Sequence, residues 1–131
     1  MASEINLTSN LSVAKGGTSV ASATSTLTTN MQSSLNNMID TTQTLTAAAD
    51  TAVTLGSIAT ATDYIVRLRN QDATNYVEVS IDGGLTYHMK MMPGEFWGPV
   101  RIEGGNVVHA KANTAACIIE IVACEAGNPL T

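Results

Sequence analysis

Apolar and polar residues alternate through the second half of the chain, which is typical of β-strands with one buried face. The clearest example is the segment DYIVRLRN. Tyr64, Val66 and Leu68 occupy alternate positions, with Arg67 and Arg69 on the opposite side. We therefore expect this segment to be a strand that turns its apolar face toward a core.

Two further segments, NYVEVSI and LTYHMKM, continue this alternation. The positions expected to face inward are Val77, Val79, Ile81, Leu85, Tyr87, Met89 and Met91. The tripeptide DGG between the two segments predicts a hairpin, because glycine accepts the positive φ angles that tight turns need. The tripeptide MPG that follows predicts the next turn, since proline presets φ ahead of a glycine.

The segment EFWGPVRIEGG predicts another strand, with Phe96, Val100 and Ile102 facing inward and Trp97 facing outward. Proline cannot donate a hydrogen bond to a neighbouring strand. Pro99 therefore indicates an edge strand or a bulge.

The last two predicted strands are NVVHAKAN and CIIEIVAC, and the second is apolar on both faces. Ile119 and Ile121 alternate with Ile118 and Val122, and only Glu120 interrupts the apolar run. A strand of this kind lies at the centre of a sandwich or is covered by a neighbouring subunit.

The two cysteines, Cys117 and Cys124, belong to this strand at positions that point to opposite faces. They are too far apart to form a disulfide, and we expect both to be reduced and largely buried. Their spacing also does not match a metal site.

The first half predicts a hairpin centred on Gly16-Gly17, flanked by small and β-branched residues. Strands with so few large side chains bury too little apolar area to offset the ordering of their backbone. We therefore expect them to pack on the second half or on another chain. One short helix is predicted in MQSSLNNMID, where Met31, Leu35 and Met38 share one helical face.

Composition changes near Thr62, from a segment rich in Ser and Thr with few charges to a more charged one. We expect residues 1–62 to form a partner-dependent N-terminal arm with strands and residues 63–131 to form the core. At 131 residues the chain predicts one domain overall. The predicted fold is all-β, an antiparallel, jelly-roll-like β-sandwich with a Ser/Thr-rich extended N-terminal arm.

Charge and hydropathy narrow the classes of function. Charged residues make up 13% of the chain and the net charge is -5, so no basic face is available for nucleic acid. No apolar run approaches the length of a membrane span, and the N-terminus lacks the features of a secretory signal. The sequence thus predicts no nucleic-acid or membrane partner and synthesis in the cytoplasm.

The candidate titratable residues of the patterned region are Asp72, Glu78, Asp82, His88 and Glu95. Each falls where a solvated turn or an outer strand face favours a polar group, and His109 fits a surface role as well. No catalytic, phosphate-binding or metal-binding pattern accompanies them. We therefore expect a chain without enzymatic activity, cofactor or metal, and with these side chains as a polar rim.

Four side chains are candidates for an interface with a partner. Trp97 is the only tryptophan, and Met91 lies near it in sequence. Exposed aromatic and methionine side chains are frequent interface anchors, although Trp97 fits equally well as a cover over a turn. Ile118 and Val122 are the second pair, on the extra apolar face of the last strand.

Three segments of the second half resemble a known family. They are RNQDATNYVEV, KMMPGE and HAKANTAACIIEI, in that order. Their centres, Asn70 to Glu78, Pro93 to Glu95 and Lys111 to Ala116, resemble the core hairpin, a turn and the approach to the last strand in small β-sandwich proteins of tailed-bacteriophage structural modules. The resemblance covers about residues 58–125, and the first half matches more loosely.

The resemblance implies a non-enzymatic component of the virion. We favour a capsid decoration, cement or head-fibre protein that binds the major capsid protein and forms a homo-oligomer, with a trimer as the expected form. The N-terminal segment would grip the shell or a sister subunit by strand addition.

Two alternatives stay open. The first is a tail, neck or receptor-binding fibre component, with Trp97 and the DGG hairpin at its tip. The second is a virion-associated carbohydrate-binding or hydrolytic module, which requires a pair of carboxylates that face one pocket.

Overall fold

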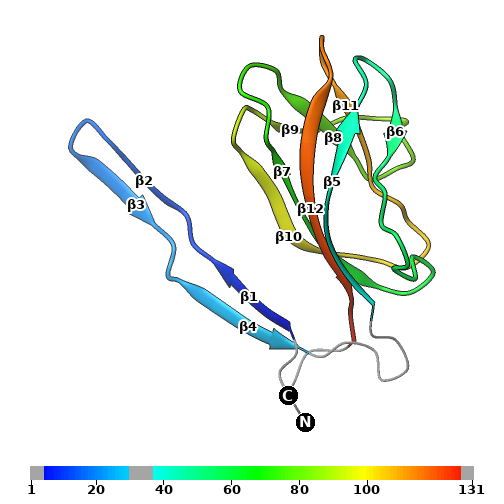
Figure 1. Ribbon diagram of the computed structural model, residues 1–131. Helices are drawn as coiled ribbons and strands as arrows, with labels where there is room; N and C mark the ends of the chain where they lie inside the picture. Colours follow the sequence, from blue (N-terminus) through cyan, green and yellow to red (C-terminus); the bar gives the residue numbers. More distant parts are fainter. Residues whose placement is uncertain (1–4, 30–36, 128–131) are drawn as a thin grey trace.

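The computed structural model describes residues 5–29 and 37–127, and every regular element within these ranges is a β-strand. A two-layered sandwich forms the body, and a narrow two-stranded ribbon projects obliquely from its base (Figure 1). The described ranges contain no helix that is long and apolar enough to cross a membrane. The predicted all-β antiparallel sandwich is confirmed.

Each layer of the sandwich is a four-stranded antiparallel sheet. The first sheet has the order β10 (Phe96–Ile102), β7 (Tyr64–Asn70), β12 (Cys117–Glu125), β5 (Met38–Leu45). The second has the order β6 (Thr51–Ala52), β11 (His109–Ala112), β8 (Val77–Ser80), β9 (Met89–Met91). The strand that is apolar on both faces, β12, lies at the centre of its sheet as expected, between β7 and β5.

The inner faces of the two sheets form one apolar core. Its fully buried members include Leu45, Tyr64, Val66, Leu68, Val77, Val79, Met91, Val108, Ile119 and Ile121. Full burial of one such aliphatic side chain contributes about 1.5–3 kcal/mol. The alternation that predicted Tyr64, Val66 and Leu68 as inward positions is confirmed.

The ribbon, called the arm below, comprises residues 5–29. Its strands are β1 (Ile5–Ser9), β2 (Ser12–Lys15), β3 (Thr18–Ala21) and β4 (Ser25–Thr29), paired β1 with β4 and β2 with β3. The predicted hairpin at Gly16-Gly17 is confirmed, and both glycines have positive φ, 58° and 82°.

Only the base of the arm packs on the sandwich. Ile5 is buried against Ile65 and Ala126, and Leu7 and Cys124 pack at the border of this small cluster. Beyond this point β2 and β3 run away from the sandwich (Figure 1). The arm is therefore held at one end and open along the rest of its length.

Two expectations for the first half need correction. The sandwich begins at Met38 rather than Asp63, because β5 and β6 belong to its sheets. Residues 31–36 of the predicted helix lie outside the described residues, and Met38 to Asp40 are strand. Pairing of β5 with β12 along its whole length satisfies backbone groups that a marginal ten-residue helix would satisfy less well.

The predicted DGG hairpin is also wrong in part. Gly83 and Gly84 do turn with positive φ, but β9 starts only at Met89, and Ile81 and Leu85 are exposed instead of buried. The Asp82 carboxylate accepts hydrogen bonds from the next two N–H groups after the glycines, which holds the chain in a loop.

In β10 the predicted faces of two neighbours are exchanged. Phe96 is exposed, whereas the Trp97 ring packs against the core. A register shift between Trp97 and Val100 separates this part of the strand from the rest, where Val100 and Ile102 face inward as expected. Pro99 thus marks both an edge strand and a bulge, which confirms that part of the prediction.

A buried carboxylate joins the ends of three segments. Glu125 is fully buried and accepts hydrogen bonds from the N–H groups of Asn37 (2.8 Å) and Ala59 (2.7 Å). The Asn37 side-chain amide donates a longer bond of 3.4 Å. Burial raises the pKa of Glu125, but these donors outweigh it and leave the pKa below its ordinary value.

We predict that Glu125→Gln lowers the free energy of unfolding by about 1–3 kcal/mol at neutral pH, because the new amide group would face an N–H donor. The contribution of the carboxylate is full above the usual glutamate pKa and is lost as the pH falls through the lowered pKa of the folded chain. The destabilisation should therefore shrink on acidification. Chemical denaturation at several pH values measures it.

The matched control is Glu103→Gln, at an exposed position. It should leave the unfolding curve nearly unchanged at every pH. Equal effects of the two substitutions would contradict the role assigned to Glu125.

Candidate functional site

Three of the four candidate carboxylates, Asp72, Asp82 and Glu95, accept hydrogen bonds within their own turns, whereas Glu78 lies on β8 opposite Lys90 and Lys111. Asp72 accepts from the N–H groups of residues 74 and 75, and Glu95 from the N–H group of Met92 (2.8 Å). The Asn75 N–H is the main reason that the pKa of Asp72 is lowered. These bonds hold local turns. No contact of the described residues brings Asp72 and Glu95 together.

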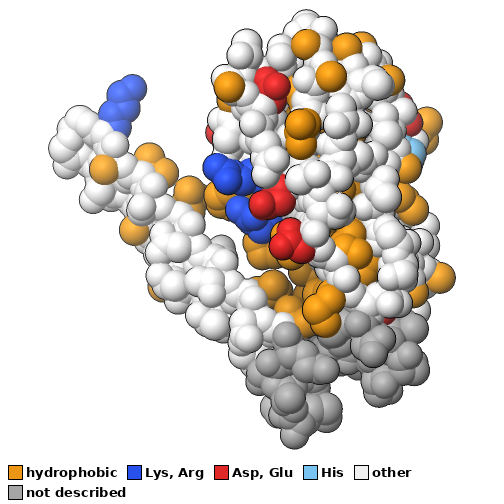
Figure 2. All heavy atoms as spheres, viewed as in Figure 1, with side chains coloured by type: hydrophobic (Ala, Val, Ile, Leu, Met, Phe, Trp, Pro, Cys, Tyr) orange, Lys and Arg blue, Asp and Glu red, His pale blue; other side chains and the backbone are white. Residues whose placement is uncertain are grey.

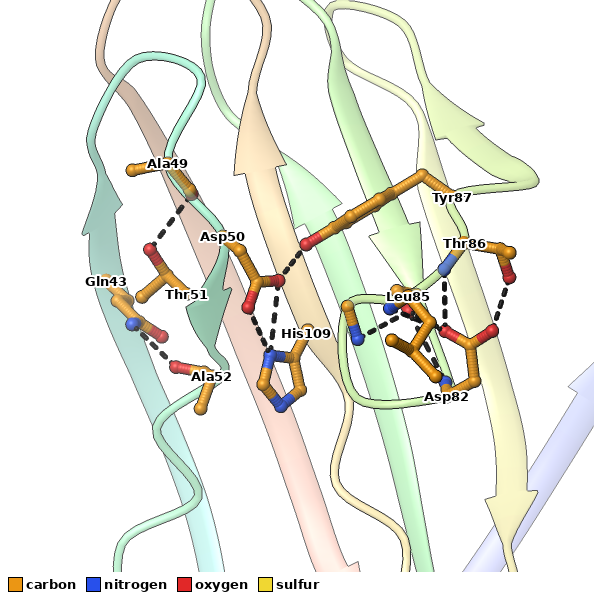
Figure 3. A network of polar contacts seen from close by, with 12 residues as sticks. Gln43, Ala49, Asp50, Thr51, Ala52, Asp82, Leu85, Thr86, Tyr87 and His109 are labelled. Atoms are coloured by element: carbon orange, nitrogen blue, oxygen red, sulfur yellow. Dashed lines mark hydrogen bonds and ion pairs between the residues drawn. The ribbon is translucent and has the colours of Figure 1, made fainter.

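Asp82 lies at the centre of the third such turn (Figure 3). It accepts bonds from the hydroxyls of Ser80 and Thr86 and from the N–H groups of Leu85 (3.1 Å) and Thr86 (2.9 Å). The Ser80 hydroxyl, followed by Thr86, lowers the pKa of Asp82 strongly. The carboxylate is therefore occupied by its own loop.

A second polar network joins three segments beside this loop (Figure 3). Asp50 contacts the Tyr87 hydroxyl and lies 3.1 Å from Nδ1 of His109, a contact that becomes an ion pair when the imidazole is protonated. The Lys111 ammonium lies 4.2 Å from the centre of the Tyr87 ring. The network ties the segment around β6 to β11 and to the loop before β9.

The contact of Asp50 with His109 has no local signature in the sequence, because the two residues are far apart along the chain. A carboxylate on one imidazole nitrogen orients the ring, as in hydrolytic triads, but a triad also needs a nucleophile at the other nitrogen. No contact of the described residues places a hydroxyl or thiol there. Within the same residues no group of three or more His, Cys, Asp or Glu is arranged to hold a metal ion. His88 is exposed, as predicted.

The three segments that carry the resemblance meet at one end of the sandwich. The backbone of Asn70 exchanges hydrogen bonds with Gly94 and Glu95, and the N–H group of Asn113 donates to the carbonyl of Tyr76. The Thr114 hydroxyl donates to the Asn75 side chain at 2.8 Å. Segments far apart in sequence therefore form one structural unit.

The centre of this unit is the fully buried side chain of Asn70, which we call the Asn70 latch. Its amide donates to the carbonyls of Asn75 (2.8 Å) and Met91 (3.2 Å), and its oxygen accepts from the N–H group of Asp72 (2.9 Å). Since Asn70 ends β7 and Met91 ends β9, the latch joins the two sheets.

A groove lies between the base of the arm and the outer face of the first sheet, the face turned away from the core. Its volume is about 640 Å³, and Ile5, Leu7, Met38, Ile65, Pro99, Val122 and Cys124 are among its apolar lining residues. A second hollow of about 540 Å³ shares Leu7 and Pro99 with it and continues past Leu27 and Phe96. Figure 2 shows hydrophobic side chains in this hollow, below a band of charged ones.

The predicted interface residues fall in different places. Val122 is 41% exposed and lines the groove, and Ile118 is 47% exposed on the same face. Trp97 is half-buried, and its indole N–H donates to the Met89 sulfur at 2.8 Å. Met91 is fully buried in the core, which confirms its inward position in the strand and excludes it as an interface anchor.

The other groove residues were not among the candidates. Met38 was predicted to be helical, and the strands of the first half were expected to pack on the second half or on another chain, without particular contacts. The signal was present in the alternation of Met38 and Asp40 with Ile39, which puts the first two on one strand face. The proximity of Ile5 to Ile65 could not be derived, because it depends on how the arm folds back.

Most charges on the outer face are paired. Arg67 lies 3.0 Å from Glu120, and Arg101 lies 3.2 Å from Asp63. The pKa of Asp63 is lowered mainly by the hydrogen bond from the Gly104 N–H group and next by the bond from Arg101. Asp40, which lines the groove, has no ion pair among the described residues, and the same holds for Lys15, the only charged residue of the arm.

No protein-family model matches the chain, and no curated protein matches it.

We predict that Asn70→Ala lowers the free energy of unfolding by about 3 kcal/mol, because it leaves two carbonyls and one N–H group without their partner. Gln71→Ala is the control, since the side chain is exposed and the Gln71 N–H bond to Ile118 is retained. Urea unfolding of both variants measures the difference. A loss below about 1 kcal/mol for Asn70→Ala, which is roughly the contribution of a single hydrogen bond, would refute the latch.

Proposed function

We propose that this chain is a non-catalytic structural component of a tailed-bacteriophage virion, and that a capsid decoration, cement or head-fibre protein is its most specific role. The sandwich would form the stable body at the particle surface. The arm and the adjacent apolar groove would make the contacts of assembly.

The observation that carries the proposal is the arm. Leu11, Val13 and Val20 are 68%, 56% and 69% exposed, and β2 and β3 pair only with each other among the described residues. A two-stranded ribbon without a covering layer is marginally stable in water. A partner that covers the ribbon face, or adds a strand to its free edges, would stabilise it.

The virion assignment draws on the resemblance of Asn70 to Glu78, Pro93 to Glu95 and Lys111 to Ala116. These segments surround the Asn70 latch, where their residues hold the two sheets together. They therefore support a common fold more directly than a common partner. The arm supplies the argument for assembly.

One observation favours the tail or receptor-binding alternative. Leu85 is 84% exposed and Ile81 is 50% exposed, both in the loop that the Asp82 network holds in shape. A rigid loop with exposed apolar side chains is suited to contact a host surface. Trp97, being half-buried, would be a poorer tip than Leu85.

The test is co-sedimentation of the purified chain with empty capsids and, separately, with isolated tails. We expect saturable binding to capsids by the full chain and binding weaker by about tenfold or more by a chain that starts at Asn37. This start retains β5 and the Asn37 contacts of Glu125.

The truncated chain must show a cooperative unfolding transition for the comparison to count, and Leu85→Ser serves as a full-length control. Capsid binding that survives Leu85→Ser and is lost without the arm supports the proposal. Binding to tails alone that Leu85→Ser abolishes supports the alternative, and binding to neither particle contradicts both.

A further inference from the structure

The outer hairpin of the arm presents a face with a defined pattern. Val13 and Val20 are directly paired across β2 and β3, and Lys15 lies two residues beyond Val13 on the same strand face. The two valines are exposed. This face therefore combines an apolar pair with a single positive charge about 7 Å further along the strand.

The groove wall has the complementary pattern on β5 and β12. Met38 is paired with Cys124 and Asp40 with Val122, so that all four side chains lie on the outer face. Met38 is 67% exposed. An apolar patch thus lies beside a single negative charge, again two residues and about 7 Å away along the strand.

We propose that the β2–β3 hairpin of a second copy of this chain seats in the groove, with Val13 and Val20 against Met38 and Val122 and with Lys15 beside Asp40. The chain's own hairpin is directed away from the sandwich (Figure 1) and does not reach this wall. In this arrangement Lys15 and Asp40 form an ion pair. The exposed valines of the hairpin and the apolar side chains of the groove wall cover each other.

The area supports a mutual exchange. The β2 strand is about 13 Å long and the ribbon about 10 Å wide, so one face of the β2–β3 hairpin covers about 130 Å². One hairpin on one neighbour would bury about 260 Å² in total, and two copies that exchange hairpins would bury about 500 Å², which is typical of a weak and reversible contact. Because mutual exchange doubles the area that each pair of chains buries, a two-fold dimer is favoured over the trimer.

The inference rests on the proposed role of the arm in assembly, but it needs no virion for its test. Sedimentation velocity over a range of concentrations should show a dimer. Lys15→Glu and Asp40→Lys should each raise the dissociation constant by about tenfold or more, because each places like charges together. The double variant Lys15→Glu/Asp40→Lys should restore it.

A cross-link gives an independent measurement. Val13→Cys places a thiol on the seating face, and a short bismaleimide should join it to the native Cys124 of the second copy. The product should vanish in Val13→Cys/Cys124→Ala. Ala14→Cys is the matched control, since residue 14 lies on the opposite face of β2.

A monomer at every concentration would overturn the inference, as would a dimer that neither charge variant weakens, or equal cross-linking from positions 13 and 14. Particle binding is scored separately. A dimer with these properties that binds neither capsids nor tails supports the exchange and removes the proposed function. If the chain binds particles but stays monomeric at every concentration, the proposed function is supported and the exchange is refuted.

Discussion

The buried amide of Asn70 is the contact on which the rest of the sandwich depends. It stands where β7 ends, and its three hydrogen bonds reach the 70–75 turn and the end of β9. A buried amide without these partners would cost more than the bonds themselves contribute, so the surrounding backbone has one favourable arrangement. The turn shapes and the spacing of the two sheets at this end follow from it.

A second buried polar group closes the other end of the same strand. Glu125 is paired with Tyr64, the first residue of β7, and Asn70 is the last. The apolar run between them could shift along β12 without losing much apolar contact. Such a shift would, however, leave both buried polar groups without their hydrogen-bond partners. The two groups therefore fix the register that puts Val66 and Leu68 inward.

Alternation predicted the central strands well because burial alone determines which way their side chains point. It failed where hydrogen bonds or backbone geometry take over. The Asp82 carboxylate keeps Leu85 out of a strand, and the bulge at Pro99 exchanges Phe96 with Trp97. Of the candidate interface, Val122 could be found from its strand, whereas the nearness of Ile5 to Ile65 depends on a chain reversal with no local signature.

The edges of the two sheets bear on the kind of assembly this protein can enter. The edge strand β10 contains a proline and a bulge, and β9 and β6 are only three and two residues long. At the fourth edge, β5, the Gln43 side chain already binds the backbone of Ala52 and Thr54. Strand addition is thus disfavoured at β10, β9 and β6, whereas β5, with eight residues, keeps a long regular edge. Growth through both edges of either sheet is therefore hindered, which favours association through faces and through the arm.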